Sequence, residues 1–243
     1  MDLARAVRTR LTFGPVANQF PVWSPDGKWI AYVTQRNGKF VLLRKASDGS
    51  GADEELLVDE QQMLTSDWSR NGKYLIYSRT SLKGLISSQP SISEVWAVPL
   101  EGERKPFQVS ASGADAHLSP DGHWVAYISR ESGETNVYVI PFGGGEGKWQ
   151  ISANGGVGAG WNRDGKTLYY VDPSFNLFAV PVKSAGSSLQ FGAAEMIAPN
   201  TLSAPNVFYQ VSPDDKKILT MQVSQQVGQS VTVVTDFRAG LKK

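Results

Sequence analysis

The sequence predicts an all-β fold of the β-propeller class, and three observations lead to this prediction. A six-residue phrase, Trp-Ser-Pro-Asp-Gly-Lys in its first copy, occurs five times, and its Asp or Asn recurs after 45, 50, 43 and 50 residues. Short runs of β-branched and aromatic residues flank the copies. Apart from residues 237–243, no segment has the apolar period of a helix. A repeat of this length is typical of propellers, solenoids and arrays. The copies are residues 23–28, 68–73, 118–123, 161–166 and 211–216.

Each phrase predicts a tight turn that joins two strands into a hairpin. In the first copy, residues 20–23 precede the turn and residues 29–33 follow it. Proline presets φ, aspartate bonds nearby backbone groups, and glycine accepts a positive φ. The fifth copy has Asp215 in place of the glycine, so we expect a different turn type there.

A third and a fourth apolar run complete each period, and four strands per period are the pattern of a propeller blade. The second run, for example residues 124–128, is apolar at nearly every position. This predicts a strand that is buried on both faces. Trp23, Trp68 and Trp161, which precede the turns, are expected to pack between blades.

The repeats predict one propeller domain that covers residues 1–243. Residues 7–12 match the pattern of a fourth strand and are expected to close the last blade, which shows no clear fourth strand. Residues 2–3 duplicate a third-strand end that residues 235–237 already supply. The sequence therefore leaves open a closed five-bladed ring and an incomplete six-bladed one. The predicted blades are about residues 18–58, 64–110, 115–152, 158–198 and 207–235.

Composition excludes several classes of function. Of the 243 residues 41% are hydrophobic, which suffices for a packed core, and the net charge of +1 without a basic stripe argues against nucleic-acid binding. The absence of cysteine rules out disulfides, thiolate metal sites and cysteine nucleophiles. No run resembles a signal peptide or reaches 18 apolar residues, which argues against membrane insertion and, as the sequence is written, indicates a cytoplasmic chain.

No set of residues in the sequence matches a catalytic or cofactor motif. The nucleophile elbow Gly-x-Ser-x-Gly does not occur. His117 and His123 flank a turn and do not form a helix-face pair, and His123 is expected to be a solvated turn residue. The glycine-rich residues 142–148 lack the Walker A spacing, and the acidic residues 48–55 lack the central glycine of an EF-hand. The sequence therefore predicts no catalytic residue, no metal and no cofactor.

The phrase and the apolar residues that follow it resemble the WD40-like (PD40) repeat of TolB-type β-propellers over about residues 7–237. Residues 18–27, 98–102, 141–152 and 232–243 are similar to the C-terminal propeller of bacterial eukaryotic-like Ser/Thr protein kinases. In that family the propeller is a six-bladed sensor or interaction module behind a membrane span. The resemblance implies an extracytoplasmic or periplasmic location if the chain belongs to such a parent. Without His-Arg-Asp and Asp-Phe-Gly motifs, kinase activity does not carry over.

The residues at the start of the first strands are the candidates for binding. Propellers place these strands along a central channel, so their polar side chains could meet a partner at the channel mouth. The alternative is that Asn18, Asp67 and Asp115 satisfy backbone groups where each blade begins. The candidate binding residues are Asn18, Gln19, Asp67, Asp115, His117 and Tyr209.

These observations favour a non-enzymatic scaffold or sensor that binds a protein or peptide through the channel mouth or one face. The first alternative is an accessory domain, detached or truncated, of a bacterial Ser/Thr kinase or another multidomain enzyme. A carbohydrate- or metal-dependent propeller enzyme is the least favoured hypothesis. A closed ring predicts a monomer, whereas an open blade edge predicts self-association.

Overall fold

The fold is described from a computed structural model of the chain. The described residues are 10–13, 15–80, 93–185, 188–199, 209–212, 216–223 and 229–235. They divide into two compact units within residues 1–116 and 117–243, and the single domain remains a prediction. The regular elements of these residues are β-strands. Among them no helix has the length and apolar character needed to cross a bilayer.

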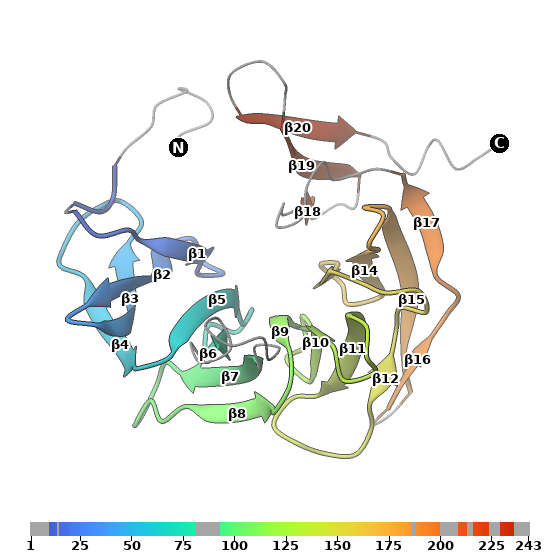
Figure 1. The fold of residues 1–243 in the computed structure, drawn as a ribbon, viewed down its shortest axis with the longest axis horizontal. Helices are drawn as coiled ribbons and strands as arrows, with labels where there is room; N and C mark the ends of the chain where they lie inside the picture. Colours follow the sequence, from blue (N-terminus) through green and yellow to red (C-terminus); the bar gives the residue numbers. More distant parts are fainter. Residues whose placement is uncertain are drawn as a thin grey trace. The chain divides into compact units, whose positions relative to one another are not determined.

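The first two sheets are four-stranded and antiparallel, with the strands in chain order. Figure 1 shows them from blue to green. The first consists of β1 (Gln19–Trp23), β2 (Trp29–Arg36), β3 (Lys39–Ala46) and β4 (Glu54–Asp59). The second consists of β5 (Gln62–Trp68), β6 (Tyr74–Thr80), β7 (Ser93–Pro99) and β8 (Phe107–Ser110).

Three further sheets follow along the chain. The third consists of β9 (Ala114–Leu118), β10 (Trp124–Ser129), β11 (Asn136–Pro141) and β12 (Trp149–Gln150). The fourth consists of β13 (Gly158–Trp161), β14 (Thr167–Val171), β15 (Leu177–Ala185), β16 (Ser188–Phe191) and β17 (Glu195–Ala198). In the described residues the fifth has three strands, β18 (Tyr209–Val211), β19 (Lys217–Val223) and β20 (Gln229–Thr235).

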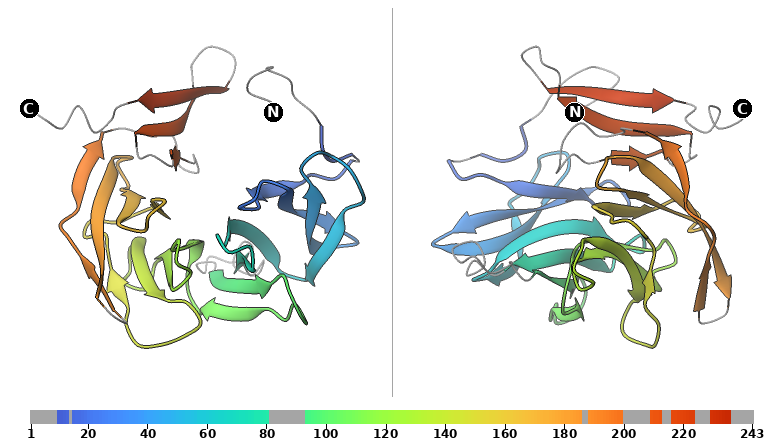
Figure 2. Two further views of the ribbon diagram at one scale, coloured as in Figure 1. Left: turned by 180° about the vertical axis from the view of Figure 1, so that it is seen from behind. Right: turned by 45° about the vertical axis from the view of Figure 1, so that its right-hand side comes forward.

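The fourth sheet differs from the prediction because it has a fifth strand. β17 pairs with the first residues of the long strand β15, and β16 pairs with its last residues (Figure 2). The additional hairpin is stable because Val182 and Leu189 are buried in one apolar cluster with Val180. The alternation of apolar and polar residues at 188–191 is the signal that the sequence offered for this strand.

The repeated phrase builds the predicted turn, and its polar side chains are used within that turn. Ser24 Oγ donates to Asp26 Oδ1 at 2.6 Å and accepts the Trp29 N–H at 2.9 Å. Asp26 Oδ1 also accepts the Lys28 N–H at 3.0 Å. The same bonds recur around Ser69 and Asn71 and around Ser119 and Asp121. The phrase is therefore structural, as predicted.

The ends of the predicted ring are only partly described. Residues 7–9 of the predicted closing strand lie outside the described residues, and residues 10–12 belong to no strand. Residues 213–215, with Asp215 of the fifth turn, also lie outside them. Ser212 Oγ accepts the N–H of Lys217 at 2.9 Å, so the serine of this copy has the role that it has in the others. Ring closure and the fifth turn type remain predictions.

The second strands are buried as predicted; Leu75 in β6 and Ala126 in β10, for example, are fully buried.

The prediction that the tryptophans before the turns pack between blades holds for two of the three. Trp68 is 7% exposed and packs in one cluster with the core of the first sheet. Trp161 donates its Nε1–H to the His117 carbonyl at 3.1 Å. Trp23 is 57% exposed, which contradicts the prediction. The other two pack on the sheet that precedes theirs in the chain, and no described sheet precedes β1.

Candidate functional site

The first strands carry an irregularity at the position of the candidate residues. The register between β1 and β2 shifts between Gln19 and Val22, and Phe20 has a φ of 54°. The register between β5 and β6 shifts between Thr65 and Asp67. Asp115 in β9 has a φ of 49°. A β-bulge of this kind redirects side chains and frees backbone groups from the ladder.

Hydroxyl groups of β5 bond backbone carbonyls of the neighbouring first strands. Thr65 Oγ1 donates to the Phe20 carbonyl in β1. The next residue, Ser66, donates its Oγ–H to the Ala116 carbonyl in β9 at 2.8 Å. These bonds lie within residues 1–116 and hold the Phe20 carbonyl of β1 and the Ala116 carbonyl of β9 against β5.

Four of the six candidate residues flank these bonds in the first unit. Asn18 and Gln19 precede Phe20 and are exposed, whereas Asp67 and Asp115 are half-buried. Both aspartates already take part in polar interactions within the protein. The two amide side chains are therefore the more accessible groups of this row.

The other two candidates belong to the second unit. His117 is half-buried in β9, has an interaction of its own, and offers its carbonyl to Trp161. Tyr209 begins β18, and its side chain lies outside the described part of the structure. His123 is exposed, as predicted for a turn residue. In the described ranges no three His, Asp or Glu side chains are grouped so that they could share a metal ion.

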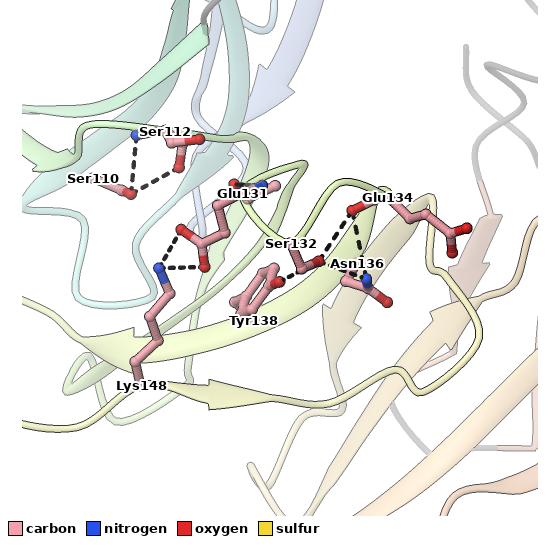
Figure 3. Close-up of polar contacts among 9 residues, drawn as sticks. Ser110, Ser112, Glu131, Ser132, Glu134, Asn136, Tyr138 and Lys148 are labelled. Atoms are coloured by element: carbon pink, nitrogen blue, oxygen red, sulfur yellow. Dashed lines mark hydrogen bonds and ion pairs between the residues drawn. The ribbon is translucent and has the colours of Figure 1, made fainter.

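A polar cluster between β10 and β12 brings together residue types that occur in catalytic sites (Figure 3). Lys148 forms an ion pair with Glu131. Burial opposes the charged form of Lys148, but the Glu131 carboxylate raises the pKa of this lysine above its usual value. Ser132 Oγ accepts from Asn136 Nδ2 at 3.0 Å and bonds the Tyr138 hydroxyl at 2.9 Å.

This cluster does not have the arrangement of an activated nucleophile. A nucleophilic serine needs a base within hydrogen-bond reach. The polar groups that contact Ser132 Oγ are a phenol, an amide and the Glu134 carbonyl. Figure 3 shows the Lys148–Glu131 pair as a separate interaction beside these contacts. The cluster therefore holds the loop between β10 and β11 in place.

A pocket between the first two turns is a site that sequence reasoning missed. Its volume is about 440 Å³, within the range of small-ligand sites. Residues 24–26, Trp29 and Arg44 line one side, and Trp68 and residues 70–72 line the other. The signal in the sequence was the second copy of the phrase, where Arg70 and Asn71 stand in place of Pro and Asp.

Arg44, which lines this pocket, belongs to an ion-pair network. Arg44 donates to Glu54 at 2.7 Å, and its guanidinium lies over the Trp29 ring at 4.6 Å. Arg104 donates to the other oxygen of Glu54 at 2.7 Å. Hydrogen bonds from Arg44 and Arg104 hold the pKa of Glu54 below its usual value, although burial opposes this. The cation over Trp29 is therefore fixed by one partner of opposite charge, Glu54, which Arg104 holds in turn.

The comparisons with known proteins identify the fold. No family model matches the chain. An uncharacterised protein of Agrobacterium fabrum is 42% identical over 53 residues, which are 22% of this chain and 18% of that protein. The chain thus covers less than a fifth of this relative. TolB from Acinetobacter baumannii superposes with a TM-score of 0.68 at 19% identity, over 91% of this chain and 52% of that one.

An oligogalacturonate lyase in complex with manganese superposes with a TM-score of 0.66 at 13% identity, over 99% of this chain and 72% of that one. These similarities show that the chain has the all-β, TolB-like propeller fold. They include a TolB protein and an enzyme, so the fold is compatible with binding in general and does not decide whether the chain is catalytic.

Proposed function

We propose that the chain is a non-enzymatic scaffold that binds a protein or peptide segment through the bulged ends of its first strands. The observation that supports this most is the row of β1, β5 and β9, where hydroxyl-to-carbonyl bonds hold carbonyls of β1 and β9 against β5. Asn18 and Gln19 extend from this row into solvent. Side-chain amides both donate and accept hydrogen bonds, which suits a peptide backbone.

A second observation favours a scaffold over an enzyme with the same fold. The acidic residue of the first, third and fourth turns is used by its own turn, as Asp26 is by Ser24 and Lys28. Asp164 likewise accepts the Lys166 N–H at 2.8 Å. The aspartate of the repeated turn thus has a structural role. The residues that could distinguish partners are therefore those of the first strands, which differ from one repeat to the next.

The test is a selection of peptides from a random display library against the purified chain, followed by calorimetric titration of the selected peptides. We expect the double variant Asn18→Ala/Gln19→Ala to bind them about tenfold more weakly, which corresponds to about 1.4 kcal/mol. His123→Ala is the control, because His123 is exposed at a turn and outside the row. Selected peptides that bind the double variant and the parent chain equally would contradict the proposal. So would lyase or hydrolase turnover that is lost in Asp115→Ala.

We also propose a second candidate, that this scaffold acts as the sensor module of a larger enzyme such as a bacterial Ser/Thr kinase. Residues 98–102 and 232–243, which are similar to kinase-linked propellers, favour it. Reading the gene upstream of Met1 tests this directly. An in-frame kinase domain followed by a membrane span would support the proposal, and an unrelated gene with its own stop codon would contradict it.

A further inference from the structure

The pocket between the first two turns lies at the opposite end of β1 from Asn18 and Gln19, because the turn at residues 24–28 follows this strand. It is therefore a second site, and it does not depend on the proposed first-strand site. Its walls come from two copies of the same phrase. Comparison with the other copies therefore shows which charges and spacings are specific to this pocket.

The second turn has become more positive without losing its structure. Asn71 Oδ1 accepts from Ser69 Oγ at 2.8 Å and from the Lys73 N–H at 3.0 Å, as an aspartate does in the first and third copies. The amide keeps both bonds and removes a negative charge. Arg70 replaces a neutral proline. Together the two replacements make this wall more positive by two charges than the wall that the first copy would form.

The guanidinium of Arg70 is available to a ligand. It lies at the surface, and within the described part of the chain it has no ion pair or hydrogen bond. Arg44 on the other wall differs, because Glu54 and the Trp29 ring hold it. An arginine of this kind at the wall of a pocket is suited to pair with a carboxylate through two parallel hydrogen bonds.

The opposite wall offers an acceptor. Asp26 Oδ1 accepts from Ser24 and Lys28, whereas the nearest cation to Oδ2 is Lys28 Nζ at 3.9 Å. Oδ2 can therefore accept an N–H from a ligand. The same carboxylate repels a doubly charged phosphate, so a ligand that combines a single carboxylate with an N–H donor fits the two walls better.

In the first sheet an ion pair occupies the position of an aromatic contact in the third sheet. In the third sheet Trp149 packs edge-on against Trp124 at 5.5 Å, and Val139 pairs with Trp149. In the first sheet the corresponding pair is Arg44 and Glu54.

Trp29, which corresponds to Trp124, is consequently half-buried rather than buried. One face of its indole lies under Arg44. The part of the indole that Arg44 leaves accessible suits an apolar side chain. A sugar ring fits less well, because it stacks on an open indole face.

We propose that this pocket binds an acidic peptide segment. The ligand carboxylate pairs with Arg70, a neighbouring backbone N–H donates to Asp26 Oδ2, and an adjacent apolar side chain lies against Trp29. The fourth turn provides a matched comparison. Arg163 occupies the position of Arg70, but Asp164 keeps its charge beside it.

The third and fourth turns are also closer together than the first two. A Cβ built on Gly165 would lie 3.5 Å from the Pro120 side chain, whereas one built on Gly72 would meet no atom within 4 Å. The space between the third and fourth turns is therefore narrower at Gly165, and Arg163 is the control for Arg70.

The test is a calorimetric titration of the full chain with two acetylated and amidated tetrapeptides, Gly-Phe-Glu-Gly and Gly-Phe-Gln-Gly. We expect the glutamate peptide to bind at least tenfold more tightly than the glutamine peptide. Arg70→Ala should abolish this preference, Arg70→Lys should keep part of it, and Arg163→Ala should leave it unchanged. Thermal unfolding of each variant shows whether the fold is kept.

Several outcomes would overturn the proposal. Equal binding of the two peptides, no binding of either, or an equal loss in Arg163→Ala would show that Arg70 does not select a carboxylate. Arg70-dependent binding of inorganic phosphate or trigalacturonate in preference to the glutamate peptide would assign the pocket to another ligand class. If Asn18→Ala/Gln19→Ala weakened the glutamate peptide as strongly as Arg70→Ala, the peptide would lie at the first strands. In that case this proposal fails and the proposed function stands.

Discussion

Ser119 Oγ donates a hydrogen bond of 2.5 Å to the carboxylate of Asp121, two residues further along the chain. The same hydroxyl accepts the Trp124 N–H at 2.9 Å, and Ser119 is 3% exposed. The serine thus connects the turn to the first residue of the strand that follows it.

Replacing Ser119 by alanine should lower the free energy of unfolding by about 1–2 kcal/mol, because a buried backbone N–H loses its acceptor. Ser119→Asn should lower it by less than half as much. In the fourth turn Asn162 takes the serine's place, and its Oδ1 accepts the Thr167 N–H at 3.1 Å. Urea unfolding of both variants gives the measurement, and an equal loss in both would contradict the role of the acceptor.

Gly72→Ala should lower the free energy of unfolding by about 1 kcal/mol through backbone strain alone, because Gly72 has a φ of 75° and a Cβ there meets no atom within 4 Å. Gly72→Asn should be milder, since asparagine tolerates this conformation. Gly156→Ala should be worse, by about 2–3 kcal/mol, because its Cβ would lie 2.6 Å from Val137 Cγ2. Thermal unfolding that ranks Gly72→Ala as the most damaging of the three would contradict this account.

Asn136→Ala should lower the free energy of unfolding by about 2–3 kcal/mol, because buried groups lose their partners. Asn136 is 5% exposed, accepts from Ser152 Oγ at 2.8 Å and the Gly155 N–H at 3.2 Å, and donates to Ser132. Ser132→Ala, at an exposed member of the same network, is the control and should change stability by less than half as much. Chemical denaturation distinguishes the two; similar losses would mean that burial is not the cause.

Lowering the pH below about 4.5, the ordinary pKa of Glu54, should destabilise the chain in part through this residue. The hydrogen bonds from Arg44 and Arg104 lower the folded-state pKa of Glu54, so the unfolded state binds the proton more readily. Its contribution is therefore complete above the unfolded-state pKa and is lost as the pH falls through the folded-state pKa. Glu54→Gln should show a shallower fall in stability between pH 5 and pH 3 in urea titrations. Identical slopes for the two proteins would argue against it.

Much of the fold could be predicted because its signals are local. The side-chain hydrogen bonds of Ser24 and Asp26 close within six residues, so the phrase specifies the turn wherever it occurs. The buried second strands follow from runs such as residues 124–128 for the same reason. The additional strand β16 was missed because its burial depends on contacts with β15.

The pocket could not be predicted because its walls are far apart in the sequence. Asp26 and Arg70 face one opening only because the first two sheets pack against each other. The amino-acid sequence alone does not indicate that these two residues are close in space. The pairing of Arg44 with Glu54 depends on the register between β3 and β4, which includes an irregularity next to these residues. The exposure of Trp23 depends equally on what lies beside β1, and the residue type gives no information about it.

The local side-chain hydrogen bonding of the turn makes it a nearly portable unit. The side chains of Ser24 and Asp26 are satisfied within residues 24–29, whereas the Gly27 and Lys28 carbonyls accept from Ser47. This hexapeptide can therefore be grafted between the first two strands of another sheet with one matching change, a serine at the position of Ser47. Strands β3 and β4 lack this independence, because Glu54 of β4 bonds Arg44 of β3 and also Arg104 in the loop between β7 and β8. An engineer who recombines such repeats should therefore exchange turns singly and exchange outer strands only in neighbouring pairs.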